Sequence, residues 1–156
     1  MEQQYTIYMD VCCLNRPFDD WLQPRIRLEA EAVLAITYRC QSGEWQLVSS
    51  TALESEIAQT PNSTKRQRVL DSLVLAHTKV LVTKIILSRA KELTALGLKS
   101  FDALHVACAE SANVDVFLTT DDRLLRHTQS HQSEIAVQVA NPVAWLMKVS
   151  KLEGDA

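Results

Sequence analysis

Residues 99–122 read KSFDALHVACAESANVDVFLTTDD, and this stretch does most to decide the fold. Ser100 is a suitable N-cap for a helix that continues to about residue 112. Residues 114–119 are rich in the branched and aromatic side chains that favour strands, and this apolar run leads to Asp121. A helix that leads directly into a buried strand is typical of the units that build a parallel sheet.

The same alternation of strands and helices extends outward to both ends of the chain. Further strands are expected at residues 6–9, 45–49, 80–82 and 135–139, and further helices at about 26–40, 51–60, 64–76, 83–97, from 123 and from 142. The polar and proline-containing residues 15–20 indicate a loop. We therefore expect one three-layer α/β/α domain, residues 1–150, around a central, mainly parallel sheet of about four to five strands. Residues 151–156 are expected to form a frayed tail.

The composition is that of an ordinary soluble globular protein. Of the 156 residues, 47% are apolar and 22% are charged, and the 3 glycines form no glycine-rich phosphate-binding motif. The longest apolar runs fall short of a spanning helix, and the first residues do not resemble a secretory signal. A cytoplasmic protein with no membrane association is therefore expected. Cys12, Cys13, Cys40 and Cys108 lack metal-ligand spacing and are expected to be small buried side chains.

Acidic residues recur where a strand is expected to end or a helix to begin. Asp10 and Asp121 follow strands, Asp102 lies in the first turn of a helix, and the fourth position is Glu56 or Glu54. Each acid alone is explained by a turn or by the helix dipole. Together they are expected to meet at the carboxyl edge of a parallel sheet, where they would repel one another unless a cation lay among them. Mg²⁺ and Mn²⁺ prefer oxygen ligands, so the pattern predicts a metal-dependent enzyme that acts on phosphates.

The charge balance is compatible with a nucleic-acid substrate but does not require one. The net charge is −3, from 16 basic and 19 acidic residues, so the chain is nearly neutral apart from these four acids. A strong nucleic-acid binder is usually basic. A bound divalent cation, however, would reverse the local charge at the acids.

Four motifs in the chain resemble the PIN-domain family of metal-dependent ribonucleases, which includes the VapC-type toxins of bacterial toxin–antitoxin pairs. They are YMDVCCLN at residues 8–15, VSS at 48–50 followed by Glu56-Ile57, KSFDALHVACA at 99–109 and FLTTDD at 117–122. The last two are the most specific, and the resemblance extends from Tyr5 to about Trp145. It implies a Rossmann-like PIN fold. It also implies that the catalytic, metal-binding residues are Asp10, Glu56, Asp102 and Asp121.

Several neighbouring polar residues are expected to support these acids. The register of the second motif favours Glu56 over Glu54, and two positions so spaced on a helix cannot both face the site. Asn15 and Ser50 are expected to make polar contacts behind the metal ligands, and Asp122 is expected to do the same beside the fourth acid.

The resemblance implies an endoribonuclease that uses Mg²⁺ or Mn²⁺ to hydrolyse RNA phosphodiester bonds, acting as the toxin of a toxin–antitoxin pair. Arg123 and Arg126 are expected to contact the phosphates of the RNA substrate. The resemblance also implies a small antitoxin partner and a homodimer. The alternative is a catalytically inactive PIN-fold module that binds RNA or a protein partner, although all four acid positions are filled. A receiver-like phosphoacceptor fits worse, because the third expected strand ends at Val82-Thr83 and not at an Asp. A haloacid-dehalogenase-type phosphatase also fits worse, because Asp10 is not followed by the second acid of a D-x-D motif.

Overall fold

Five parallel strands lie at the centre of the computed structural model, which describes residues 3–154 of the chain. The strands are β1 Thr6–Met9, β2 Gln46–Ser50, β3 Thr78–Val80, β4 Val116–Leu118 and β5 Val139–Ala140. Their order in the sheet is β3-β2-β1-β4-β5, and every neighbouring pair is parallel. The predicted α/β architecture is therefore confirmed.

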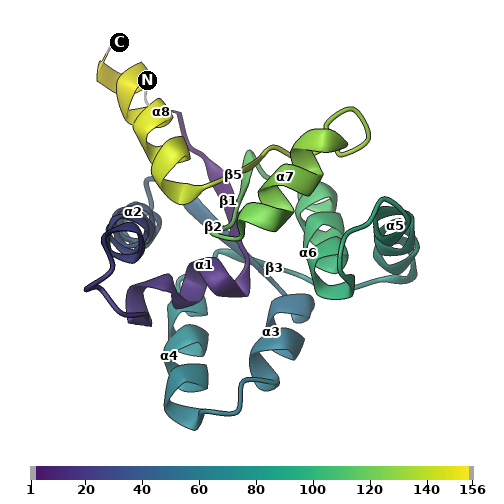
Figure 1. The fold of residues 1–156 in the computed structure, drawn as a ribbon, viewed down its shortest axis with the longest axis horizontal. Helices are drawn as coiled ribbons and strands as arrows, with labels where there is room; N and C mark the ends of the chain where they lie inside the picture. The colour runs from purple at the N-terminus through teal and green to yellow at the C-terminus, as the bar shows by residue number, and fades with distance from the viewer. Residues whose placement is uncertain (1–2, 155–156) are drawn as a thin grey trace.

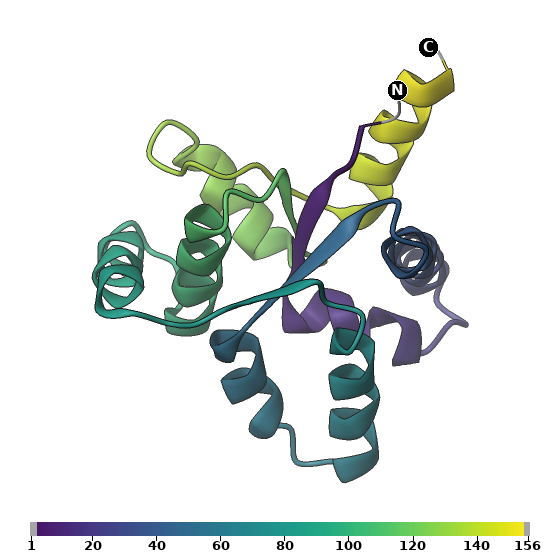
Figure 2. The same ribbon diagram turned by 180° about the vertical axis from the view of Figure 1, so that it is seen from behind.

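Helices cover both faces of this sheet. They are α1 Val11–Asn15, the 3₁₀ helix η1 Arg16–Phe18, α2 Pro24–Gln41, α3 Thr51–Ala58, α4 Ser63–Leu73, α5 Lys84–Ala95, α6 Ser100–Ser111, α7 Asp122–Ser130 and α8 Pro142–Gly154. Figures 1 and 2 show α2 and α8 on one side of the sheet and α5, α6 and α7 on the other. Helices α3 and α4 extend beyond the carboxyl end of β2 (Figure 1). Helices α1 and α3 directly follow β1 and β2, so they begin at the carboxyl edge of the sheet.

The central strand β1 pairs with β2 on one side and with β4 on the other, and its residues 7–9 are buried. Ile7 lies opposite Leu47 of β2 and Val116 of β4, and all three side chains are fully buried. A strand that is apolar on both faces is expected when helices cover both faces of a parallel sheet. None of the described helices is long and apolar enough to cross a membrane. All four cysteines are free, and three of them are buried as expected, whereas Cys12 is partly exposed.

Residues 11–18 form helices where the sequence predicted a loop from residue 15 onward. The Asp10 side chain accepts a hydrogen bond from the backbone N–H of Cys13 at 3.0 Å and so caps α1. Pro17 lies in the first turn of η1, where its missing N–H is not needed. Helices of this length show too few turns for an apolar period to appear in the sequence.

The two edges of the sheet also differ from the prediction. Strand β3 was expected at 80–82 and is found at Thr78–Val80, and β5 was expected at 135–139 and is only Val139–Ala140. Short edge strands have a neighbour on one side only, so their apolar pattern is weak. Helix α6 begins one residue earlier than predicted, and its N-cap is Lys99 instead of Ser100.

The carboxyl terminus continues as helix beyond the predicted domain boundary. Residues 151–154, expected in a frayed tail, extend α8, and Glu153 accepts hydrogen bonds from Arg39 at 2.6 and 3.1 Å. The remaining residues of that expected tail, 155 and 156, lie outside the described part of the chain, as do residues 1 and 2.

Candidate active site

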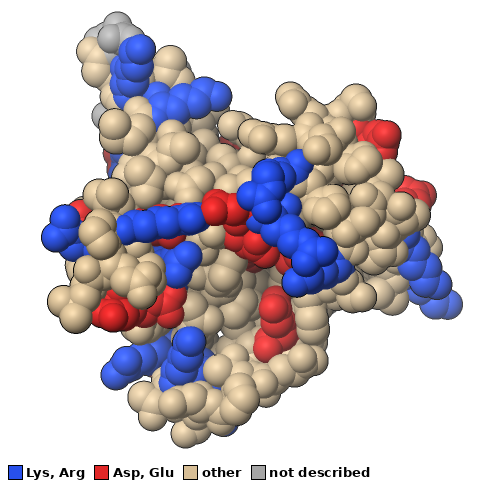
Figure 3. Space-filling model, in the orientation of Figure 1, with Lys and Arg blue, Asp and Glu red and all other residues tan. Residues whose placement is uncertain are grey.

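A cleft of about 400 Å³ opens at the carboxyl ends of β1 and β4, beside the first turns of α6. It is lined by the four predicted acids Asp10, Glu56, Asp102 and Asp121. They come from four separate segments of the chain, and the fold brings them together at one edge of the sheet. Figure 3 shows Asp and Glu side chains near the middle of this face, flanked by Lys and Arg.

Two of the acids are fixed in place because they begin helices. Asp10 is 4% exposed, caps α1 and also accepts a hydrogen bond from the Cys12 thiol at 3.1 Å. Asp121 caps α7, and its Oδ1 accepts the backbone N–H of Arg123 at 2.9 Å. Capping stabilises a helix by about 1 kcal/mol, so each carboxylate is held by the fold itself.

The other two acids lie on helices that face the cleft. Asp102 is in the first turn of α6, and Glu56 is on α3. The His105 Nε2 atom lies 2.6 Å from Glu56 Oε1. By contrast, Glu54 pairs with Lys79 at 3.2 Å and lines a different pocket, between α4 and β3. The two glutamates therefore point to different surfaces, and only Glu56 reaches the other three acids.

The cleft disfavours negative charge as it stands. The pKa of Asp102 is raised to about 6, first by burial and then by the negative charges of Asp10 and Asp121. Burial also raises the pKa of Asp10, although hydrogen bonds to its carboxylate oppose that shift. A carboxyl whose pKa is raised by burial and by neighbouring carboxylates, as that of Asp102 is, indicates a place where a positive charge would be favourable.

The side chains in the cleft fit a hard divalent cation. Four carboxylates supply only oxygen donors, which suit Mg²⁺ and Mn²⁺. Burial, followed by the negative charge of Asp10, raises the pKa of the Cys12 thiol to about 12, and this thiol donates a hydrogen bond to Asp10. Within residues 3–154, no three His, Cys, Asp or Glu side chains converge closely enough to enclose an ion as they stand. The acids line the cleft at wider spacing than a closed coordination shell.

Asp102→Asn should raise the free energy of unfolding of the metal-free protein by about 1 kcal/mol near neutral pH, once solvent screening of the partly exposed carboxyl is allowed for. The folded-state pKa of about 6 lies above the unfolded value of about 4. Wild-type stability therefore falls as pH rises through this window and stays lower above it. Urea denaturation with chelator present, at about pH 4 and at about pH 7.5, measures the effect.

Most of the gain should disappear at the lower pH, where the Asp102 carboxyl is protonated in the folded state and about half protonated in the unfolded state. Glu31→Gln on the exposed side of α2 is the matched control, with no gain at either pH. An equal difference between wild type and Asp102→Asn at both pH values would contradict the assignment of the shift to Asp102.

The predicted supporting residues differ in how close they lie to the cleft. Ser50 is fully buried and caps α3 by accepting the Leu53 N–H at 3.0 Å. Asn15 ends α1, and its buried Oδ1 has no hydrogen-bond partner within the described residues. Asp122 is absent from the cleft lining, because both its oxygens accept hydrogen bonds from Arg25 at 2.7 Å.

The basic residues after the fourth acid lie on α7, next to the cleft. Arg123 lines a small crevice with Asp102 and Lys99. Arg126 is one turn further along α7 and lines neither the cleft nor this crevice. Lys99, which sequence reasoning did not single out, lines both. Its position at the start of the KSFDALH motif, next to a predicted site acid, was the available signal.

The chain is similar to one protein-family model and to several solved structures. A family model described as PIN domain matches residues 24–129. The crystal structure of FitAcB from Neisseria gonorrhoeae is similar with a TM-score of 0.57 and 16% sequence identity, over 87% of this chain and 97% of that chain. The structure of VapBC2 from Rickettsia felis, bound to a DNA fragment from their promoter, is similar with a TM-score of 0.51 and 14% identity, over 86% and 98% of the two chains. No curated protein sequence matches the chain.

Proposed function

Because the chain belongs to the PIN domain family, we propose that it is an endoribonuclease that uses Mg²⁺ or Mn²⁺ to hydrolyse RNA phosphodiester bonds. The observation that carries this proposal is the cleft in which Asp10, Glu56, Asp102 and Asp121 meet. Their mutual repulsion suits a site that gains a divalent cation together with a phosphate substrate.

The four carboxylates would hold the cation, and the protein contributes their placement. Asp10 and Asp121 are fixed as helix caps, so little ordering is needed when the site fills. A bound divalent cation supplies a water of lowered pKa and stabilises negative charge on the leaving oxygen. Lys99 lines the cleft, and Arg123 lines the small crevice that shares Lys99 and Asp102 with it, so both would orient the phosphodiester by charge.

Arg123→Ala should raise KM for a short RNA about fivefold and leave kcat nearly unchanged, because an exposed charged contact contributes about 1 kcal/mol to binding. Steady-state kinetics at low and at moderate salt would measure this, with a smaller salt dependence expected for the variant. Lys148→Ala, which removes the same charge from the exposed surface of α8, is the control. A fall in kcat with KM unchanged would instead place Arg123 in the chemical step.

We further propose that the chain acts as the toxin of a pair, restrained by a small antitoxin protein, and that it forms a homodimer. The similarity to the VapBC2 structure, which contains two different proteins bound to promoter DNA, supports the first proposal. Exposed apolar side chains such as Val74 and Ile85, 80% and 83% exposed, offer surface that partners could cover. Size-exclusion chromatography with light scattering tests the homodimer, and co-expression with the neighbouring gene product tests the antitoxin.

The experiment that tests the nuclease is cleavage of a labelled single-stranded RNA panel with Mg²⁺, with Mn²⁺ and with chelator. Asp10→Asn keeps an N-capping side chain and removes one carboxylate, so it should fold and fail to cut. Asp71→Asn, on the exposed face of α4, is the charge-matched control and should cut like wild type. Metal-independent cutting, or cutting that survives in Asp10→Asn, would refute the proposal. RNA binding without any cutting would favour the inactive binding module.

A further inference from the structure

A buried row of hydrogen bonds leads from the second strand to the cleft. The Ser50 hydroxyl lies 2.7 Å from the Tyr8 hydroxyl, which lies 2.7 Å from Nδ1 of His105. The other ring nitrogen, Nε2, lies 2.6 Å from Glu56 Oε1. Ser50, Tyr8 and His105 are each at most 1% exposed. Four elements, β2, β1, α6 and α3, are therefore joined by polar contacts, of which the first two are buried and the last, to Glu56, is partly buried.

The direction of each hydrogen bond follows from the groups at its ends. An ionised carboxylate only accepts, so Nε2–H of His105 must donate to Glu56. In a neutral imidazole the other nitrogen is then an acceptor, and the Tyr8 hydroxyl donates to Nδ1. The ordinary pKa of a tyrosine phenol is about 10, so near neutral pH the Tyr8 hydroxyl holds the proton that it donates. Ser50 completes the row by donating to the Tyr8 oxygen while it accepts the Leu53 N–H at 3.0 Å.

Glu56 is the side chain whose position is fixed most by this row of hydrogen bonds. Its side chain is 33% exposed, whereas that of His105 is 1% exposed. A glutamate that is one-third exposed on an eight-residue helix has several accessible rotamers, and ordering such a side chain is unfavourable. The hydrogen bond to a buried, immobile imidazole fixes Oε1 and leaves the second carboxylate oxygen for a ligand. Ring packing restrains the imidazole further, because Tyr8 stacks on Phe117 with 5.3 Å between ring centroids and His105 stacks on Phe101 at 6.0 Å.

We propose that Tyr8 and His105 are positioning residues that hold the Glu56 carboxylate ready to bind a divalent cation. The inference rests on the proposed function, in which Glu56 is a metal ligand. Tyr8 acts indirectly. Its hydroxyl fixes which nitrogen of His105 carries the proton, and the hydrogen bond from that nitrogen holds the Glu56 carboxylate in place. Partners of this kind behind a metal ligand typically change metal affinity by about 10-fold to 100-fold when they are removed.

The test measures Mn²⁺ affinity by titration calorimetry, independently of RNA cleavage. Tyr8→Phe keeps the ring and removes only the hydroxyl, and it should weaken Mn²⁺ binding about tenfold. His105→Leu should weaken it at least as much. His105→Gln should recover part of the loss, because its amide can donate to Glu56. Thr128→Val is the control: it removes another buried hydroxyl, one that donates only to carbonyls of its own helix α7, and should leave the affinity unchanged.

A second readout needs no metal. In ¹⁵N NMR spectra of the metal-free protein at about pH 7.5, His105 should be the Nε2–H tautomer, and Tyr8→Phe should shift its ring nitrogens. An Nδ1–H tautomer, or Mn²⁺ affinities of Tyr8→Phe and His105→Leu within about twofold of wild type, overturns the proposal. Should Tyr8→Phe fail to fold, the comparison of His105→Gln with His105→Leu decides in the same way.

Glu56→Gln separates this inference from the proposed function. If wild type binds Mn²⁺ and Glu56→Gln binds it equally well, Glu56 is not a ligand, and the positioning role is overturned while the nuclease proposal stands on the other acids. If wild type itself does not bind Mn²⁺, the proposed function fails and this inference with it. Weakened binding in Glu56→Gln, Tyr8→Phe and His105→Leu together supports both.

Discussion

Asp102→Asn should lower the rate of RNA cleavage by about 1,000-fold and leave the fold intact. The substitution is isosteric and removes one negative charge from the cleft. A bound metal ion stabilises the transition state by several kcal/mol, and a loss of about 4 kcal/mol corresponds to about 1,000-fold in rate. Single-turnover cleavage at saturating Mn²⁺ measures the loss, and the circular dichroism spectrum confirms folding.

The two glutamates of α3 provide the matched control for that experiment. Glu56→Gln should also reduce cleavage strongly, since Glu56 lines the cleft, whereas Glu54→Gln should have a small effect, since Glu54 pairs with Lys79 in a different pocket. Equal losses in both would mean that the effect comes from α3 as a whole and not from the cleft. Retention of more than about a tenth of the wild-type rate in Asp102→Asn would contradict a metal-ligand role.

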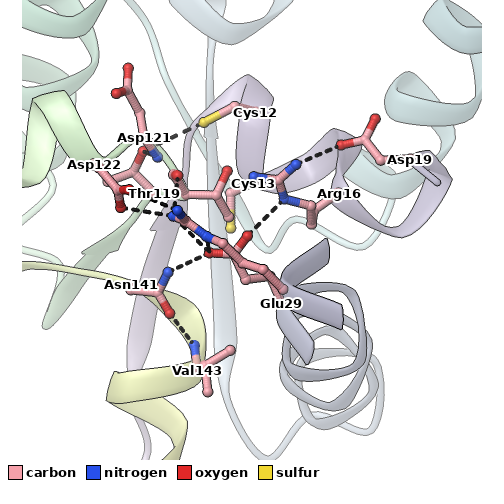
Figure 4. Close-up of polar contacts among 12 residues, drawn as sticks. Cys12, Cys13, Arg16, Asp19, Glu29, Thr119, Asp121, Asp122, Asn141 and Val143 are labelled. Carbon is pink, nitrogen blue, oxygen red and sulfur yellow. Dashed lines mark hydrogen bonds and ion pairs between the residues drawn. The ribbon is translucent and has the colours of Figure 1, made fainter. Parts of the chain in front are cut away.

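Glu29→Gln should lower the free energy of unfolding by about 3 kcal/mol, the largest stability loss that we expect from a single isosteric change. Glu29 is 2% exposed on α2. Its Oε1 lies 3.0 Å from Arg16 Nε, as an ion pair without good hydrogen-bond geometry, and its Oε2 accepts from Asn141 at 2.6 Å. Figure 4 shows Glu29 between these two side chains. Removing the buried negative charge leaves the Arg16 guanidinium, with a side chain only 19% exposed, insufficiently compensated.

Urea denaturation followed by circular dichroism measures this loss, assuming that unfolding is two-state. Glu31→Gln, two positions further along the same helix and exposed, is the control and should change stability by less than about 0.5 kcal/mol. A loss below about 1 kcal/mol in Glu29→Gln would show that Arg16 is sufficiently neutralised by its other partner, Asp19, at 3.1 Å.

The sequence predicted the site best where acidic residues stand at the ends of apolar strands, because the topology of a parallel sheet then specifies where those residues lie. Asp10 and Asp121 follow apolar strands. Because the carboxyl ends of parallel strands lie at the same edge of a sheet, the sequence alone predicts that these two acids lie close together. Helix α1 could not be predicted, because it is five residues long and depends on a side-chain cap. Strand β3 was placed two residues late, because an edge strand with exposed residues lacks the strong apolar pattern of a buried one.

The contacts between distant residues were beyond the reach of sequence patterns. Glu56 and His105 are separated by 49 positions, and Arg25 and Asp122 by 97. Their pairing depends on how α3 packs against α6 and on where the first turns of α2 and α7 lie, which local periodicity does not specify. Asp122 illustrates the consequence: adjacent to a site acid in sequence, its carboxylate is engaged by an arginine from another helix.

Asp10 and Asp121 each cap a helix and also line the cleft. This double role constrains how the site can change over evolution. Substitution by alanine would remove a charge and a cap together, at a cost of about 1 kcal/mol in stability for each helix. Asparagine or serine would keep the cap and lose only the charge. Descendants of such a chain can therefore lose the proposed catalytic activity through single substitutions that leave the stability of the scaffold unchanged. Inactive relatives should accordingly carry capping residues, and not small apolar ones, at these two positions.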